Sequence, residues 1–204
     1  GVLYTHAGLE IGVAATKTFM AQMAAVYLLG LYLGQQRGLL GEDFVRDVFS
    51  YLEMLSSKIE EVLEETEAIE ACADKYCRCE DFLFLGRNIN YPMAMEAALK
   101  LKEISYIHAE GYPAGEMKHG PIALLHPGFP VVALIPRDPI YDKVRNNIEE
   151  VRARQAPVIA LATMGDGEVR DFCDEAIFVP GVKANFNPVV LAPALQLLAY
   201  HIAK

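Results

Sequence analysis

Three side chains that can move or hold protons lie within one short stretch of the chain: Lys100, Glu103 and His119. Glu103 lies one helical turn after Lys100, so the two side chains would share a helix face and the ammonium would keep the carboxylate ionised. A segment broken by glycine and proline precedes His119 and can turn its imidazole toward a site outside the helix. An ionised carboxylate and an imidazole are the groups that acid–base catalysis on a small organic substrate requires.

Spacing alone leaves a simpler alternative open. In that interpretation Lys100 and Glu103 form a surface ion pair, and His119 is an unrelated loop residue. His108 and Glu110 follow the pair directly, and we expect them to be local hydrogen-bonding partners rather than catalysts.

The apolar pattern predicts an α/β lobe that would position this stretch. Short apolar runs bounded by turn residues are typical of strands buried on both faces of a parallel sheet; they are residues 82–85, 131–135, 158–162 and 176–179. Helical patterns alternate with them, which predicts a three-layer α/β sandwich with right-handed crossovers. The helix with Lys100 and Glu103 should begin at Pro92, at the sheet edge where open α/β folds bind ligands.

The other helices follow from the same reading. Residues 140, 144, 148 and 151 form one apolar stripe, and a last helix should run from about Pro188 to Lys204. The first third of the chain is expected to be helical without strands. Residues 12–36 predict one nearly all-round apolar helix buried inside the protein, and residues 42–56 and 58–76 predict further amphipathic helices.

Composition excludes several classes of protein. The 204 residues are 53% hydrophobic and 22% charged, as in globular proteins, and the net charge of -9 argues against nucleic acid or an anionic membrane as a partner. The longest apolar run, residues 19–34, is too short to cross a bilayer comfortably. No export signal is recognised, so we expect a cytoplasmic protein with reduced thiols at positions 72, 77, 79 and 173. The histidines at 6, 126 and 201 lack ligand-like spacing, and no metal is expected.

Longer words in the chain resemble a known family. KLKEISYIHAE (residues 100–110) and AGEMKHGP (residues 114–121) resemble the second sugar-isomerase (SIS) lobe of the glutamine–fructose-6-phosphate aminotransferases, also called glucosamine-6-phosphate synthases. Residues 7–17 resemble the end of the first SIS lobe, and residues 195–203 resemble the helix that closes the second. The resemblance implies a flavodoxin-like SIS fold in which residues 1–57 are a helical remnant of the first lobe and residues 58–204 are the second lobe.

The resemblance also implies an activity and roles for individual residues. The family converts fructose 6-phosphate and glutamine-derived ammonia to glucosamine 6-phosphate, and no cofactor is implied. Glu103 matches the base that moves a proton between neighbouring sugar carbons, and Lys100 matches a lysine beside that base. His119 matches the histidine that opens the sugar ring, which the partner subunit of a homodimer supplies. Val13 and Ala14 match backbone positions that contact the sugar at the start of a helix.

Departures from the family pattern leave alternatives open. The family's phosphate-binding loop, its Schiff-base lysine and its glutaminase domain have no counterpart in these residues; Lys204 does not match that lysine, and Ala15 stands where many relatives have serine. We therefore expect a fragment with little activity alone, whose first apolar helix is covered by another subunit. The alternatives are a sugar-phosphate-binding SIS module without turnover and a ketose-amine deglycase. Glu103 together with His119, within these words, favours the synthase.

Overall fold

The computed structural model describes residues 1–64 and 66–204, which form two compact units, Gly1–Glu60 and Glu61–Lys204. The division falls close to the predicted one at residues 57 and 58. The identity of the first unit as the remnant of another lobe stays a prediction.

The first unit contains helix α1 (Lys17–Gln36) and most of helix α2 (Glu42–Glu64). Two details of the prediction were wrong. The first helix begins at Lys17 rather than at residue 12, because the preceding residues bend and the backbone N–H of Thr18 is capped by the carboxylate of Glu10. The second helix continues to Glu64, because its amphipathic pattern runs past residue 56 without a glycine or proline to end it.

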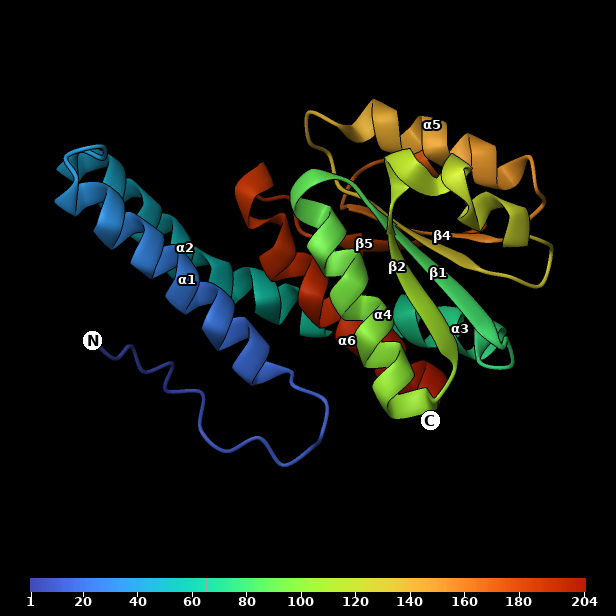
Figure 1. Cartoon of the computed structure of the whole chain (residues 1–204), viewed down its shortest axis with the longest axis horizontal. Helices are drawn as coiled ribbons and strands as arrows, with labels where there is room; N and C mark the ends of the chain where they lie inside the picture. Colours follow the sequence, from blue (N-terminus) through green and yellow to red (C-terminus); the bar gives the residue numbers. More distant parts are fainter. Residues whose placement is uncertain (65) are drawn as a thin grey trace. The chain divides into compact units, whose positions relative to one another are not determined.

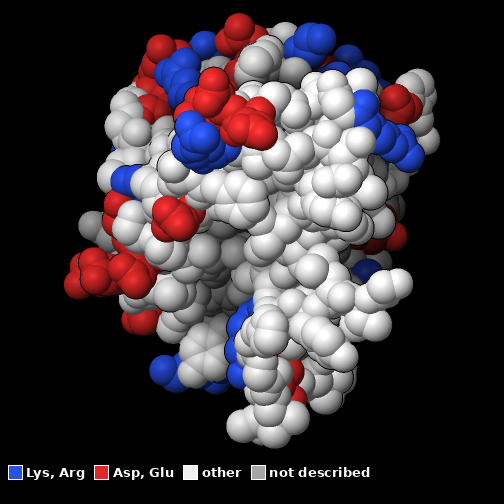
Figure 2. Space-filling view, turned by 90° about the vertical axis from the view of Figure 1, so that its left-hand side faces the viewer, with Lys and Arg blue, Asp and Glu red and all other residues white. Residues whose placement is uncertain are grey.

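Helix α1 was also expected to be buried, and none of its residues is. An all-round apolar helix needs neighbours on every side, and the described residues do not cover it completely. Val26 is 68% exposed and Tyr32 is 57% exposed, and Leu29 and Leu33 are also exposed. The face drawn in Figure 2 has broad areas without charged side chains, and acidic and basic side chains gather mainly toward the top of the view.

The second unit has the predicted three-layer α/β architecture (Figure 1). Its five strands are all parallel and lie in the order β2-β1-β3-β4-β5. The strands are β1 (Asp81–Gly86), β2 (His108–Pro113), β3 (Val131–Ile135), β4 (Val158–Thr163) and β5 (Glu175–Val179). The helices are α3 (Glu67–Tyr76), α4 (Tyr91–Ser105), α5 (Tyr141–Arg152) and α6 (Asn187–Ala203), with short 3-10 helices η1 (Asn88–Asn90), η2 (Ala114–His119), η3 (Pro121–Leu124), η4 (Glu168–Asp171) and η5 (Ala184–Phe186).

The helices bury both faces of the sheet. Helices α3, α4 and α6 pack together on one face, and α5 lies with η2 on the other (Figure 1). Alternate residues of the central strands serve the two layers. Leu83, Val131 and Ala133 belong to the core beneath α5, where Val144 and Ile148 meet them. This arrangement confirms residues 144, 148 and 151 of the predicted stripe, whereas residue 140 precedes α5 and is only half-buried.

Strand β2 was not predicted. Its sequence, HAEGYP, has no continuous apolar run, because it forms an edge of the sheet and pairs only with β1, from Asp81↔His108 to Gly86↔Pro113. Edge strands tolerate glycine, proline and charge, so the pattern of a buried strand is missing there.

Two glycines let helix α4 lie directly on the sheet. A Cβ atom at Gly111 of β2 would lie 2.4 Å from the Cα of Met95, and one at Gly86 would lie 2.3 Å from the carbonyl oxygen of Asn90. Both neighbours are backbone atoms and cannot move aside independently. The glycines therefore fix how closely α4, with Lys100 and Glu103, approaches β1 and β2.

One helix in the described part of the chain is long and apolar enough to cross a membrane by length and composition. It spans Ala184–Ala203, and 67% of its most apolar 18-residue stretch is buried inside the structure. Core helices of globular proteins pass the same test, so this is weak evidence for a membrane span.

Candidate functional site

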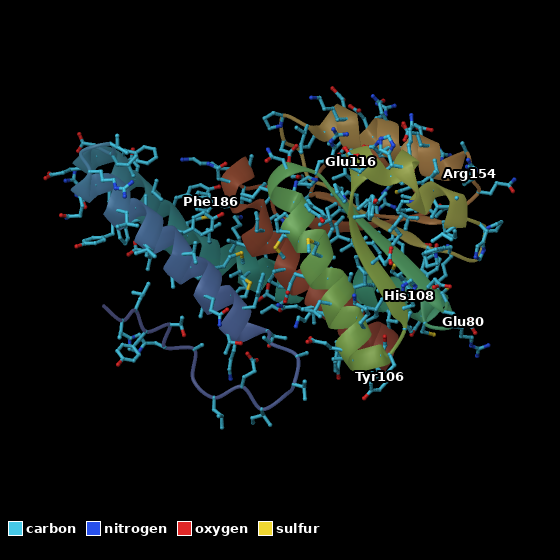
Figure 3. The ribbon with its side chains drawn as sticks, viewed as in Figure 1. Glu80, Tyr106, His108, Glu116, Arg154 and Phe186 are labelled. Atoms are coloured by element: carbon cyan, nitrogen blue, oxygen red, sulfur yellow. The ribbon has the colours of Figure 1, made fainter. Side chains whose placement is uncertain are left out.

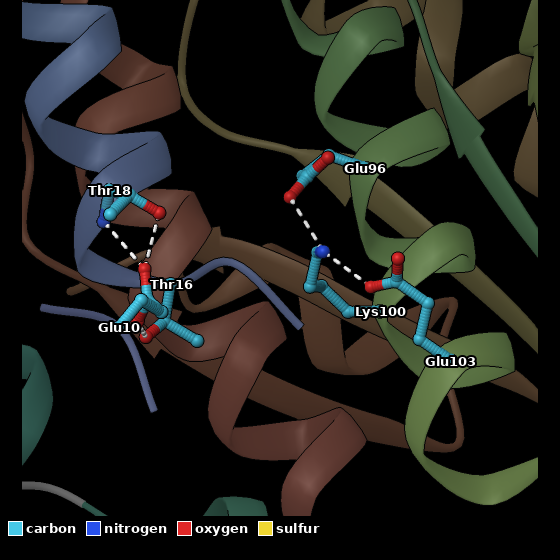
Figure 4. A network of polar contacts seen from close by, with 6 residues as sticks. All are labelled: Glu10, Thr16, Thr18, Glu96, Lys100 and Glu103. Atoms are coloured by element: carbon cyan, nitrogen blue, oxygen red, sulfur yellow. Dashed lines mark hydrogen bonds and ion pairs between the residues drawn. The ribbon is translucent and has the colours of Figure 1, made fainter. Parts of the chain in front are cut away.

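A lysine between two carboxylates forms the centre of the candidate site (Figure 4). The Nζ atom of Lys100 lies 2.6 Å from Oε2 of Glu103 and 3.6 Å from Oε1 of Glu96. The three residues share one face of α4, since they follow each other at spacings of four and three. Lys100 is only 4% exposed, so the pair is not the surface ion pair of the simpler alternative.

Glu96 is a member of this group that the sequence analysis missed. Glu96 lies four residues before Lys100, and this spacing already predicts that the two side chains share a helix face. The prediction paired Lys100 with Glu103 alone. Burial raises the pKa of the Glu96 carboxyl, while the ammonium of Lys100 acts in the opposite direction.

His119 lies at the end of η2, outside the layer that holds α4. Its side chain is 74% exposed, and Nε2 lies 3.6 Å from Oε2 of Glu116. Within the described residues no hydrogen bond or ion pair joins His119 to Lys100 or Glu103. The second unit by itself does not connect the predicted imidazole with the predicted base.

His108 takes the hydrogen-bonding role that was expected of it, whereas Glu110 lies too far from His108 for a hydrogen bond. Nδ1 of His108 lies 2.7 Å from Oδ1 of Asp81, and Nε2 lies 3.7 Å from Oε1 of Glu110. His108 begins β2 and Glu116 follows its end, so the two lie at opposite ends of that strand (Figure 3). These contacts join the starts of β1 and β2, away from the edge where open α/β folds bind ligands.

Val13 and Ala14 lie in the first unit, in the bend before α1. They precede the helix by four and three residues, because the helix begins only at Lys17, and the side chain of Val13 is fully open to solvent. This corrects the expectation that they stand at the start of the helix. Val13 and Ala14 belong to the first unit, and Lys100 and Glu103 belong to the second. Neither unit taken by itself relates the two pairs of residues.

A network around Glu10 holds this bend against the helix start (Figure 4). Oε1 of Glu10 accepts a hydrogen bond of 2.8 Å from the Thr16 hydroxyl, and Oε2 accepts from the backbone N–H and the hydroxyl of Thr18. The hydroxyl of Thr18 is the main reason why the pKa of Glu10 falls to about 2. The sequence carries no local signal for this role, since the contact depends on how the chain turns between residues 10 and 18.

The cysteine side chains show no sign of a catalytic role. The four cysteines are free, and burial raises the pKa of Cys72 to about 12 and that of Cys173 to about 11, so these thiols are poor nucleophiles. Among residues 1–64 and 66–204 no group of three or more His, Cys, Asp or Glu side chains is arranged to hold a metal ion.

Comparisons with known proteins agree on one family. The SIS domain family model matches residues 76–203. Glutamine–fructose-6-phosphate aminotransferases (isomerizing) of Synechocystis sp. and Thermus thermophilus are each 51% identical to 99% of the chain, which covers 32% and 33% of their lengths. The chain thus spans about a third of the curated relatives it matches.

A solved structure gives the same result. The C-terminal domain of the glucosamine-fructose-6-phosphate aminotransferase of Francisella tularensis is 37% identical, with a TM-score of 0.92 over 97% of this chain and 56% of that one. The strand order, the helix layers and the extent of the family match lead to one conclusion. The chain belongs to the SIS domain family.

Proposed function

We propose that this chain is the isomerase part of a glucosamine-6-phosphate synthase, which converts fructose 6-phosphate and glutamine-derived ammonia to glucosamine 6-phosphate. The observation that carries the proposal is the buried Lys100 between Glu96 and Glu103 on α4. The half-identical aminotransferases, matched over almost the whole chain, support it.

The proposed chemistry is a proton transfer between neighbouring sugar carbons. Glu103 acts as the base that takes a proton from one carbon and returns it to the next, through an enediol or enolamine. Its carboxylate loses its charge when it accepts the proton. The ammonium of Lys100 then still has the carboxylate of Glu96 at 3.6 Å as a second partner.

The proposal assigns the other steps to residues outside this cluster. His119 opens the sugar ring, and it does so at the site of the partner subunit in a homodimer. Its exposed side chain supports that role, because it is free to reach beyond its own lobe. The backbone of Val13 and Ala14 contacts the sugar, and the Glu10 network holds that backbone in place. A cytoplasmic location without membrane or nucleic-acid partners belongs to the same proposal.

The alternatives have less support. A sugar-phosphate-binding module without turnover does not need a buried lysine with two carboxylates, since burying charged groups costs stability unless they serve a purpose. A ketose-amine deglycase would use the same fold and base, but the relatives matched over the whole chain are named aminotransferases.

The test is the substitution Glu103→Gln in the natural full-length protein. We expect isomerisation of fructose 6-phosphate to fall by about 10²- to 10⁴-fold, the usual contribution of a general base, while binding of the sugar phosphate is largely kept. Glu80→Gln, at an exposed position before β1, is the matched control and should leave both unchanged. An unchanged turnover number in Glu103→Gln would refute the assignment of the base.

A further inference from the structure

The segment that carries His119 is fastened to the rest of the second unit by a chain of polar contacts. Nζ of Lys118, the residue before His119, lies 2.9 Å from Oε1 of Glu150 on α5. The other carboxylate oxygen of Glu150 accepts a hydrogen bond of 3.4 Å from Nδ2 of Asn147. Oδ1 of Asn147 in turn accepts one of 3.0 Å from Nη1 of Arg87.

The same arginine also touches the segment at its other end. Arg87 follows β1, and its guanidinium covers the Cα of Gly115: a Cβ there would lie 3.1 Å from Nη2 and 3.3 Å from Cζ. Any residue larger than glycine would push the guanidinium away. Arg87 thus contacts η2 directly at Gly115 and, through Asn147 and Glu150, indirectly at Lys118.

The contacts surround a segment whose apolar side is already fixed. Ala114 and Met117 of η2 are fully buried in the core with α5, and Asn147 is only 7% exposed. The apolar contacts fix the height of η2 above the sheet. The side that carries Lys118 and His119 is exposed, and the contact of Lys118 with Glu150 joins this side to α5.

We propose that Arg87, Asn147 and Glu150 are positioning residues that hold η2 so that His119 points away from its own lobe. The inference rests on the proposed function, in which His119 opens the sugar ring. None of the three residues touches the substrate in this proposal. They act through Gly115 and Lys118, and their loss should affect ring opening before it affects the proton transfer at Glu103.

Glu150→Gln in the natural full-length protein tests the proposal, with Glu149→Gln as its matched control. Glu149 is the neighbouring acid on α5 and pairs with Arg152 on the surface, so the two variants lose the same charge from the same helix. We expect Glu150→Gln to lower kcat for the closed-ring sugar by about tenfold, since a small misplacement of a catalytic group has effects of that order or larger. An open-chain analogue should react at nearly the wild-type rate.

A second measurement does not depend on activity. Hydrogen exchange of the peptide covering residues 114–120 should be faster in Glu150→Gln than in Glu149→Gln. Arg87→Lys should behave like Glu150→Gln, because lysine keeps the charge but loses the planar fork that bonds Asn147 and covers Gly115.

The outcomes separate the two proposals. A wild-type protein without isomerase activity would overturn the proposed function, while the exchange experiment would still test the network. Wild-type activity with unchanged exchange and kcat in Glu150→Gln would overturn the positioning role. Equal losses for the closed-ring sugar and the open-chain analogue would also overturn it, because a general structural defect slows both.

Discussion

The burial of Lys100 requires that acidic side chains lie next to its ammonium group. A buried ammonium without a partner costs several kcal/mol, so a lysine that is 4% exposed needs a carboxylate within reach. Here it has two, at 2.6 Å and 3.6 Å. One carboxylate is enough to balance the charge, so the cluster holds one carboxylate more than the ammonium requires.

The raised pKa of Glu96 predicts a pH dependence of stability. Burial makes the folded protein hold this proton more tightly than the unfolded chain does, so the stabilisation is fully present below the ordinary pKa of 4.5 and is lost as pH rises through the raised value. Glu96→Gln cannot titrate. The free energy of unfolding of wild type minus that of the variant should therefore fall between pH 4 and pH 7 in urea titrations. A difference that rises over this range would contradict the prediction.

At the scale of single residues, the sequence predicted the contact between Lys100 and Glu103 but not the larger group of polar side chains around it. Lys100 and Glu103 were predicted because a spacing of three places two side chains on one helix face whatever the tertiary structure is. Glu96 lies four residues before Lys100, so its contact with Lys100 was equally predictable from the sequence. The role of Glu10 was not predictable in this way, since Thr16 and Thr18 reach it through a turn without periodicity.

Helix α4 depends on the sheet beneath it as a whole element. We expect Gly111→Ala to lower the free energy of unfolding by about 1–3 kcal/mol, the usual cost of overpacking, because its Cβ would lie 2.4 Å from the backbone of Met95. Gly167→Ala is the matched control, since its φ of -69° suits alanine and nothing lies within 4 Å of the added atom. Thermal or urea unfolding of the two variants compares them. Equal stability would show that α4 can move away from β2 without cost.

The starts of α4 and α6 share one carboxylate. Oδ2 of Asp138 accepts hydrogen bonds of 3.0 Å from Nδ2 of Asn90 and 3.3 Å from Nδ2 of Asn187, and both asparagines are buried. Asp138→Ala leaves two buried donors without an acceptor, and we expect a loss of about 1–3 kcal/mol. Hydrogen exchange should increase at the first turns of both helices together.

The control for Asp138→Ala is Asp142→Ala, an exposed acid in the first turn of α5. It removes the same charge four residues further along the chain and should cost far less. If hydrogen exchange in Asp138→Ala increases only at the first turn of α6, the hydrogen bond from Asn90 to Asp138 does not stabilise the start of α4.

The elements themselves were predictable where they are buried. The strands β1, β3 and β4 form continuous apolar runs, because they lie inside the sheet and helices cover both of their faces. Strand β5 lies at the other edge of the sheet and was predicted from the apolar run of residues 176–179. The edge strand β2 has neither the run nor the alternation, and its hydrogen bonds to β1 hold it in place instead. The start of α1 was misplaced for a related reason: apolar residues continue upstream of Lys17, and the capping contact from Glu10 that ends the bend is not local.

At the scale of the whole molecule, the exposed side of α1 predicts a homodimer. Val26, Leu29 and Leu33 recur at helical spacing, and with Tyr32 they leave an apolar stripe in water, as interaction surfaces do. We expect the natural full-length protein to be a dimer by light scattering at micromolar concentration, and Val26→Glu with Tyr32→Glu to shift it toward monomer by placing charge in the contact. Leu39→Glu, in the connection after α1 and 75% exposed, is the control and should remain dimeric. A wild-type protein that is monomeric at this concentration would contradict the prediction and would also leave the imidazole of His119 without a partner site. The same measurement therefore tests the assembly and the chemistry that depends on it.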